Sequence, residues 1–204
     1  MHLKPALFLF KALIMQVSVI QLSASEEYVD LKEFLTLPSK TWTYNSTLKL
    51  PYDCRMDNIV NETKEANFYY IYFNHSMRDY KGIFSTIRYG RIFENYDRPG
   101  KPWNVMFITE YATGYASREM VFGIKEKCAV IKVDRFEDTF PSNYELLVKP
   151  KARRDPPEEC LTKFKECAEK SQKTSYAVYK AECKSLYRKK KKTAALPRVL
   201  DSTK

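Results

Sequence analysis

The sequence contains few of the residues on which enzymes depend. It has five glycines and two histidines among 204 residues, and His75 is the one histidine beyond the N-terminal segment. Ser-His-Asp and Cys-His sites need an imidazole to accept the proton of the nucleophile, whereas His75 lies inside a glycosylation sequon, where we expect it to be exposed. The chain also contains no G-x-S-x-G, P-loop or G-x-G-x-x-G motif. These absences favour a binding protein that is not an enzyme.

Patterns typical of metal sites are missing as well. No two cysteines have the two-residue spacing of a zinc knuckle. Adjacent acids occur, as in Glu137 with Asp138 and Glu158 with Glu159, but neighbouring side chains diverge in both strands and helices. Such pairs indicate a solvated surface instead of a catalytic carboxylate pair. Because the cysteine spacing does not fit and His75 is the one histidine beyond the signal peptide, the sequence predicts no metal, and it predicts no cofactor.

Residues 1–25 have the composition of a signal peptide. Two lysines without an acid precede a largely apolar stretch over 12–22, and small residues follow it. A membrane anchor is the alternative, but Lys11 and Gln16 interrupt a stretch that is already too short to span a bilayer. We therefore predict a secreted, extracellular protein without a membrane span, whose mature chain begins at residue 26.

Three sequons support export of the chain. They place candidate glycosylation sites at Asn45, Asn61 and Asn74, each followed by Ser or Thr two positions later and without an intervening proline. Glycans at these sites would keep one side of the protein in solvent. The alternative, that the sequons stay unoccupied, is open at each site.

All five cysteines lie beyond the signal peptide. An odd number leaves one thiol over, so the simplest arrangement is two disulfides and one cysteine that is free or intermolecular. Disulfides require an oxidising compartment, which agrees with the predicted secretion.

The positive charge is concentrated at the C-terminus. The chain carries a formal charge of +10, of which +6 comes from residues 188–204 and +2 from the signal peptide. Residues 26–187 are nearly neutral and long enough for one domain with a sizeable core. Secretion argues against a nucleic-acid partner, so the basic segment is interpreted as a disordered tail, or as one that meets glycans or anionic membranes.

Between these ends the pattern is mostly that of β-strands. Eight segments rich in Tyr, Phe, Val and Ile follow one another with short connections, at about 41–49, 52–59, 67–74, 83–93, 103–111, 117–125, 127–133 and 143–149. Consecutive strands with short connections predict an all-β fold, an eight-stranded antiparallel barrel wide enough for one small ligand. A β-sandwich is the main alternative.

The pattern changes after residue 157. Cys160, Phe164, Cys167 and Ala168 recur at three- and four-residue spacing, which predicts a helix over 158–170 with an apolar stripe. We expect this stripe to pack on the barrel wall.

The later part of the chain resembles a known family. The runs Cys128-Ala-Val-Ile131 and Tyr144-Glu-Leu-Leu147, Cys160 with Phe164 and Cys167, and the late Glu182-Cys183-Lys184 are similar to the tick salivary lipocalins related to histamine-binding proteins. The resemblance implies a secreted lipocalin barrel with a helix on its wall, which sequesters a host mediator such as an amine or a lipid. It also implies disulfides joining Cys54 to Cys183 and Cys128 to Cys160, with Cys167 as the odd cysteine.

The resemblance also identifies candidate ligand contacts. Ala129 stands where the amine binders have Asp, and Leu147 where they have an aromatic residue, while Glu145 matches their pattern. A buried ammonium needs a carboxylate and often an aromatic face, so these differences weaken the amine hypothesis. If Cys128 points outward, strand alternation places Ala129 and Ile131 inside, together with Glu145 and Leu147.

Two further residues are candidates for the pocket. Glu110 is a possible second carboxylate at the end of a strand, where an exposed acid is the alternative. Trp42 near the start of the first strand is expected to plug the closed end of the barrel. The predicted function is sequestration of a biogenic amine, leukotriene or fatty acid inside the barrel. The alternative is a lipocalin scaffold that acts through its surface on a host protein, such as complement, or on a glycan.

Overall fold

The regular structure of the described residues is a single antiparallel sheet with helices α2 and α3, and a short helical turn at 183–185. The computed structural model describes residues 29–36, 40–65, 68–93, 103–110, 114–135, 141–185 and 187. The predicted signal peptide (1–25) and basic tail (188–204) therefore lie outside the described residues. The elements are α2 (Leu31–Thr36), β1 (Lys40–Ser46), β2 (Asp53–Glu65), β3 (Phe68–Asp79), β4 (Gly82–Phe93), β5 (Val105–Glu110), β6 (Gly114–Ile124), β7 (Cys128–Arg135), β8 (Asn143–Val148), α3 (Glu158–Lys170) and β9 (Tyr176–Ala177).

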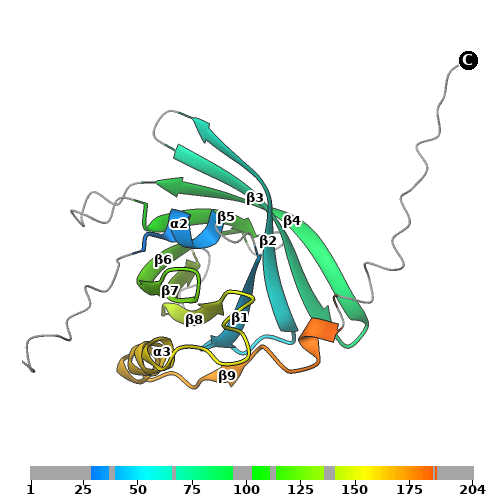
Figure 1. Cartoon of the computed structure of the whole chain (residues 1–204), viewed down its shortest axis with the longest axis vertical. Helices are drawn as coiled ribbons and strands as arrows, with labels where there is room; N and C mark the ends of the chain where they lie inside the picture. The colour runs from blue at the N-terminus through cyan, green and yellow to red at the C-terminus, as the bar shows by residue number, and fades with distance from the viewer. Residues whose placement is uncertain are drawn as a thin grey trace, which may run out of the picture.

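The first strand closes the sheet into a barrel. Strands β2 to β8 pair in sequence order, and β1 pairs with both β8 and β2. Trp42 marks the closure, since it stands opposite Val148 on one side and Met56 on the other. All of these pairings are antiparallel. The predicted eight-stranded barrel is confirmed, and the sandwich alternative is wrong (Figure 1).

Strand alternation gives the barrel wall two distinct apolar faces. On β7, Cys128 and Val130 belong to an outer cluster, whereas Ala129 and Ile131 belong to the cluster inside the barrel. The alternation follows from the period of two along a strand. The prediction that Cys128 faces outward and its neighbour inward is therefore confirmed.

Helix α2 closes one end of the barrel (Figure 1). Its residues Leu31, Phe34 and Leu35 are buried in the inner cluster. The helix begins after Asp30, whose Oδ1 accepts a hydrogen bond of 2.7 Å from the backbone N–H of Glu33, as an N-cap residue does.

A buried lysine joins α2 to the closed end. The Nζ of Lys149 donates to the carbonyl oxygen of Leu35 at 3.3 Å and to Oγ1 of Thr41 at 3.1 Å. It also lies 4.6 Å from the centre of the Phe34 ring. Burial lowers the pKa of Lys149 to about 7, because removal from water disfavours the charged ammonium.

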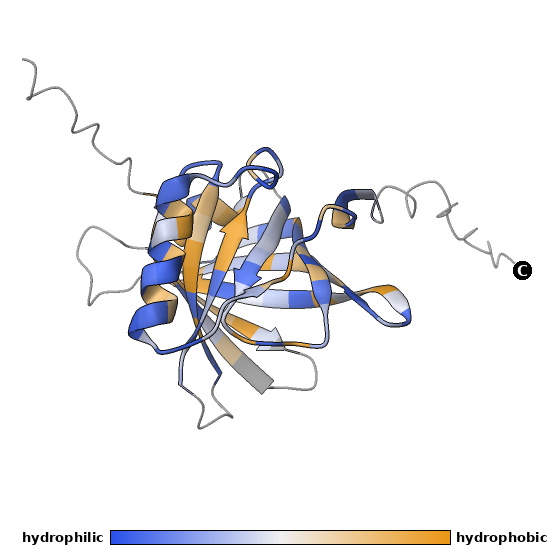
Figure 2. Cartoon of the chain, turned by 90° about the horizontal axis from the view of Figure 1, so that it is seen from below, coloured by the Kyte–Doolittle hydropathy of each residue, from blue (hydrophilic) through white to orange (hydrophobic). Residues whose placement is uncertain are grey.

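Helix α3 packs on the outside of the wall, as the sequence predicts. Its buried residues are Cys160, Phe164, Cys167 and Ala168. Figure 2 shows its hydrophobic positions on the side that faces the strands. A disulfide joins Cys160 to Cys128 on β7, which is the pairing implied by the resemblance. Within the described residues, no helix is long and apolar enough to cross a membrane.

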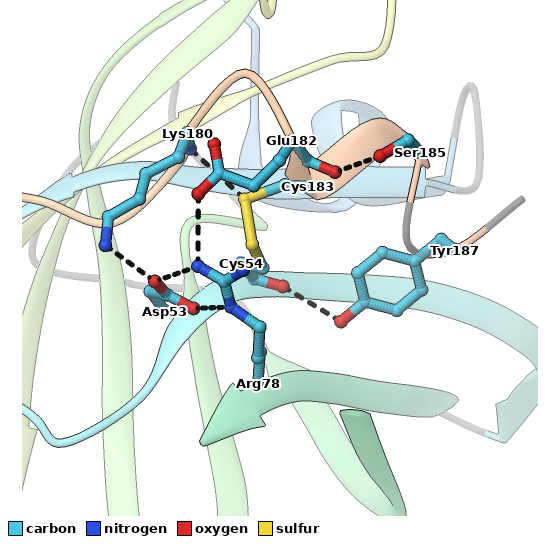
Figure 3. Close-up of polar contacts among 8 residues, drawn as sticks. All are labelled: Asp53, Cys54, Arg78, Lys180, Glu182, Cys183, Ser185 and Tyr187. Carbon is cyan, nitrogen blue, oxygen red and sulfur yellow. Dashed lines mark hydrogen bonds and ion pairs between the residues drawn. A yellow bond between two sulfur atoms is a disulfide. The ribbon is translucent and has the colours of Figure 1, made fainter. Parts of the chain in front are cut away.

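The segment after α3 returns along the barrel and is fastened to it. Strand β9 pairs with β1, and a disulfide joins Cys183 to Cys54. Beside this disulfide the guanidinium of Arg78 donates to both carboxylate oxygens of Asp53 at 2.6 Å, and Lys180 lies 2.8 Å from the same carboxylate (Figure 3). The Tyr187 hydroxyl donates to the carbonyl oxygen of Cys54 at 2.9 Å.

This segment explains a wrong prediction for Trp42. The indole does not plug the barrel but belongs to the outer cluster, where Tyr179 and Tyr187 make edge contacts with it at 5.2 Å between ring centres. Trp42 faces outward because the alternation on β1 turns Thr41 and Thr43 inward. The C-terminal segment then supplies the cover that the indole needs.

Strands β2 and β3 are longer than predicted. The sequence places their ends at residues 59 and 74, whereas β2 runs to Glu65 and β3 to Asp79. The extension of β2 is polar and exposed, so it lacks the apolar alternation of a half-buried strand. It is ordered by backbone pairing with the aromatic start of β3.

We predict that truncation of Phe164 destabilises the protein through loss of the contact between α3 and the wall. Phe164 is buried, so Phe164→Ala should lower the free energy of unfolding by about 3–4 kcal/mol. Lys165→Ala, an exposed neighbour on the same helix, should change it by less than about 0.5 kcal/mol. Urea unfolding followed by fluorescence measures both, and equal effects would contradict the packing.

Candidate functional site

The open end of the barrel contains a cavity of about 350 Å³. It lies opposite the end closed by α2, and the loop between β1 and β2 borders it. Its apolar lining comes from Leu48, Leu50, Pro51, Tyr52, Met77, Phe84 and Val133. Its polar lining comes from Arg55, His75, Thr86, Arg88, Arg118, Arg135, Asn143 and Glu145. The cavity therefore combines an apolar wall with an unusual number of guanidinium groups.

A buried carboxylate holds together three strands beneath this cavity. Asp57 on β2 accepts a hydrogen bond of 2.9 Å from Nη1 of Arg118 on β6, and its other oxygen is hydrogen-bonded to Nδ1 of His75 on β3. All three side chains are buried. Burial alone would raise the pKa of Asp57, but the charges of His75 and Arg118 outweigh it and hold that pKa well below its usual range.

A second buried ion pair lies beside the first. Nη1 of Arg55 donates to Oε1 of Glu145 at 2.7 Å. Burial raises the pKa of Glu145 while the charges of Arg55 and Arg118 lower it, and the net direction is downward. Glu145 is thus the ionised counterion of Arg55, and the charge of Arg118 also stabilises its ionised form.

Arg55, which lines the cavity, retains unused hydrogen-bonding capacity. Within the described part of the chain, its Nε and Nη2 have no hydrogen-bond partner, and neither has Oε2 of Glu145. A buried donor without a partner is costly. A guanidinium that offers two N–H groups suits a carboxylate, sulfate or phosphate, because these anions accept such donors in parallel.

The residues predicted to form the pocket wall divide into two groups. Glu145 lines the cavity. Ala129, Ile131 and Leu147 also point into the barrel, but they are packed in the inner cluster with α2. The structure brings all four to the inner face, and three of them fill the closed half of the barrel.

Glu110, Trp42 and His75 do not lie where the sequence analysis expected them, or cannot be placed. Glu110 is the last residue of β5, and its side chain lies outside the described residues. Trp42 is on the outer face and lines no part of the cavity. The expectation that His75 is exposed is wrong, since it is 3% exposed: it alternates with the outward residues Asn74 and Ser76, and so faces inward.

Sequence reasoning missed the arginines of the cavity. Arg55, Arg88, Arg118 and Arg135 come from β2, β4, β6 and β7, and no spacing motif links them. One of them could have been found by strand alternation. On β7, Arg135 lies an even number of residues from Ala129 and Ile131, which the sequence already placed inside, so Arg135 should point inward as well. The same reasoning could not be applied to β2, β4 and β6, because the sequence does not show which residues of these strands point inward.

The odd cysteine lies on the outer helix. Cys167 is a free, buried cysteine on α3, and burial raises the pKa of its thiol. Among the described residues, no group of three His, Cys, Asp or Glu side chains could hold a metal ion.

Comparison with known proteins identifies one family. A family model described as tick histamine binding protein matches residues 36–185. No curated protein matches the chain. The matched range contains the complete barrel and α3.

Solved structures show the same fold at low sequence identity. The siderocalin Ex-FABP is 12% identical with a TM-score of 0.50, over 70% of this chain and 92% of that chain. The bovine lipocalin allergen Bos d 2 is 12% identical with a TM-score of 0.50, over 77% and 97%. The H1 crustacyanin of the lobster Homarus americanus is 10% identical with a TM-score of 0.50, over 76% and 81%. These similarities show a lipocalin fold.

We predict that the Asp57 carboxylate stabilises the fold in a pH-dependent way. Asp57→Asn leaves Arg118 buried without its charge partner, so it should cost about 3–5 kcal/mol of unfolding free energy at pH 7. The folded-state pKa of Asp57 is depressed, so the contribution is complete above the unfolded pKa of about 3.9 and declines as pH falls below it.

The difference between wild type and Asp57→Asn should therefore shrink by about 1.4 kcal/mol per pH unit below pH ~4. Urea unfolding at pH 7, 4 and 3 measures this change. Asp155→Asn, at an exposed position, is the control, and it should change the unfolding free energy by less than about 0.5 kcal/mol at each pH. A difference that is constant between pH 4 and pH 3 would contradict an ionised, buried Asp57.

Proposed function

This chain belongs to the tick histamine-binding protein family, and we propose that it is secreted and sequesters an amphipathic ligand with a carboxylate head group inside its barrel. Of the ligands predicted from the sequence, a fatty acid or a leukotriene fits this description and a biogenic amine does not. It involves no catalytic step. The protein acts by holding the ligand away from its target.

The observation that carries this proposal is the position of Arg55. The guanidinium is buried at the cavity, one nitrogen is bound to Glu145, and Nε and Nη2 have no hydrogen-bond partner among the described residues. A ligand carboxylate could accept from both nitrogens. Charge-assisted hydrogen bonds of this kind are about twice as strong as neutral ones, and the low dielectric of the barrel strengthens them further.

The same geometry disfavours an amine. An ammonium needs a carboxylate to offset its desolvation. Oε2 of Glu145 has no hydrogen-bond partner among the described residues, but the charge of Glu145 is already offset by Arg55 and that of Asp57 by Arg118. The cavity lining carries four guanidinium groups against one carboxylate, so its net charge repels an ammonium. An anion in the same place would gain a comparable attraction.

The apolar part of the cavity suits the body of a lipid. Leu48, Leu50 and Pro51 border it from the β1–β2 loop, and Met77 and Phe84 border it from β3 and β4. The volume of about 350 Å³ lies at the lower end of the range for small-molecule sites, ~300–1,000 Å³. The closed half is filled by side chains, so the ligand occupies the open half.

Secretion is supported by the disulfides. Two of them join the barrel to α3 and to the C-terminal segment, and such bonds persist in oxidising compartments. The predicted signal peptide supplies the route. Secretion and sequestration together describe a protein that intercepts a mediator outside the cell.

We predict that binding depends on the ionised head group of the ligand. Isothermal titration calorimetry with a polyunsaturated C20 fatty acid should give an affinity about tenfold or more above that of its methyl ester. Histamine and serotonin should bind at least as weakly as the ester. Equal affinity for the acid and the ester would show that no guanidinium contacts the carboxylate. If the protein binds neither the acid, nor a leukotriene, nor either amine, the scaffold alternative is favoured.

Removal of the guanidinium should have a corresponding effect. The double variant Arg55→Met/Glu145→Leu deletes the ion pair without leaving a lone buried charge, and we expect it to fold and to bind the acid about tenfold or more weakly. Arg154→Met, at an exposed position, is the matched control with unchanged affinity. Retained affinity in the double variant would assign head-group binding to a different residue.

A further inference from the structure

Exposed apolar side chains are unevenly distributed over the outer surface of the described residues. Large hydrophobic residues with high exposure are Val60 (55%), Tyr72 (39%), Tyr80 (89%) and Ile87 (62%). Tyr80 lies in the turn between β3 and β4. The other three lie on β2, β3 and β4, whereas α3 packs against β6, β7 and β8 (Figure 1).

These three residues are direct neighbours of two sequon asparagines. Tyr72 stands opposite Asn61 in the β2–β3 register, and Ile87 stands opposite Asn74 in the β3–β4 register. Val60 precedes Asn61 at a bulge. Opposite residues have Cβ atoms about 5 Å apart, so each asparagine lies within contact distance of an exposed apolar side chain.

Tyr72 is placed between the two asparagines. It shares the outer face of β3 with Asn74, two residues and about 7 Å away. Its ring contacts Tyr89 on the β4 side at 5.3 Å between centres and 51° between planes. The side of Tyr72 toward β2 faces Asn61, which is exposed.

Space for a bulky group lies next to Asn74. An external groove of about 550 Å³ borders Asn74. Its other lining residues are Lys40, Trp42, Met56, Asn58, Ser76, Ser85, Pro150, Arg153, Lys184 and Tyr187. Oδ1 of Asn74 is buried, and in the described residues it has no hydrogen-bond partner. A polar group with hydroxyl or amide donors would satisfy this oxygen.

We propose that carbohydrate attached to Asn61 and Asn74 covers this surface, with the first sugar on Asn61 lying over Tyr72 and the sugar on Asn74 covering Ile87. A pyranose ring has C–H groups on one face that pack on the electron-rich face of an aromatic ring, while its hydroxyl and N-acetyl groups meet water or the Asn74 oxygen. Val60, Tyr72 and Ile87 then form a platform for the chain's own glycans.

Attachment follows ordinary amide chemistry. The Nδ2 of asparagine attacks the anomeric carbon of a lipid-linked oligosaccharide diphosphate, a C–N bond forms as the C–O bond to the diphosphate breaks, and Nδ2 loses one proton. The lipid diphosphate leaves with the bonding electrons. The secretory pathway proposed for this chain supplies that donor, and the transfer requires an extended chain, so burial of Ser76 in the folded barrel does not oppose it.

Asn45 provides an internal contrast. It is half-buried, its Nδ2 donates to Oγ of Ser175 at 3.3 Å, and its strand partners are Leu146 and Ala177. None of the exposed large hydrophobic residues of the described chain stands beside it in these pairings. Carbohydrate at Asn45 would therefore have no apolar platform.

The test uses the full chain secreted from a glycosylating eukaryotic cell. Peptide mapping should find carbohydrate on Asn61 and Asn74. Asn61→Gln and Asn74→Gln should each lower the melting temperature by about 2–4 °C, and Asn45→Gln should leave it unchanged. An endoglycosidase that leaves one N-acetylglucosamine should preserve most of the stabilisation, because the first sugar makes the contact.

The Tyr72→Ala variant tests whether the sugar on Asn61 stabilises the protein through contact with Tyr72 or simply by being attached. In this variant the Asn61→Gln change should no longer lower the melting temperature, whereas in Tyr80→Ala, the matched exposed tyrosine, it should lower it as in wild type. Absence of carbohydrate from either asparagine would overturn the proposal. So would an undiminished effect of Asn61→Gln in the Tyr72→Ala background.

Discussion

Closure of the sheet by β1 is the constraint on which the remaining structure depends. Because β1 pairs with both β8 and β2, the strands form a closed ring, and side chains that point inward from the ring are enclosed. Helix α2 then removes solvent from one end. Polar groups that point inward must find partners within the barrel or in a ligand, since burial without a partner is costly.

The charged layer shows how this constraint selects a ligand. Asp57 with Arg118 and Glu145 with Arg55 are ion pairs that join strands far apart in the sequence. Well-packed apolar residues are often at least as stable as buried ion pairs, so folding stability alone does not account for them. The binding role that we propose does, because each pair neutralises a carboxylate and fixes a guanidinium at the wall of the cavity, where it would be pre-organised for an anion.

The sequence predicts the architecture well because its signals are local. The alternation along each strand, the apolar stripe of α3 and the parity of Cys128 and Ala129 are set by residues that are close in sequence. The inward faces of β2 and β3 are not local: two bulges shift the register of β2, and the parity of a strand is fixed only by its neighbours. Arg55 and Arg118 were missed for this reason. His75 was expected to be exposed because it lies in a sequon, and nothing local shows that β3 turns its side chain inward. Trp42 was misplaced for a similar reason, since its cover comes from Tyr179 and Tyr187, more than a hundred residues away.

The residues that differ from the amine-binding pattern lie in the filled half of the barrel. Ala129 and Leu147 stand opposite each other on β7 and β8, and both are packed in the inner cluster beneath α2. Two apolar residues at these positions let the closed half fill with side chains, which leaves the open half for a ligand. Glu145 keeps the position of the pattern, but its partner is Arg55 instead of an ammonium. The same carboxylate that would bind an amine thereby holds the cation that would bind an acid, so a change of ligand charge requires no change of fold.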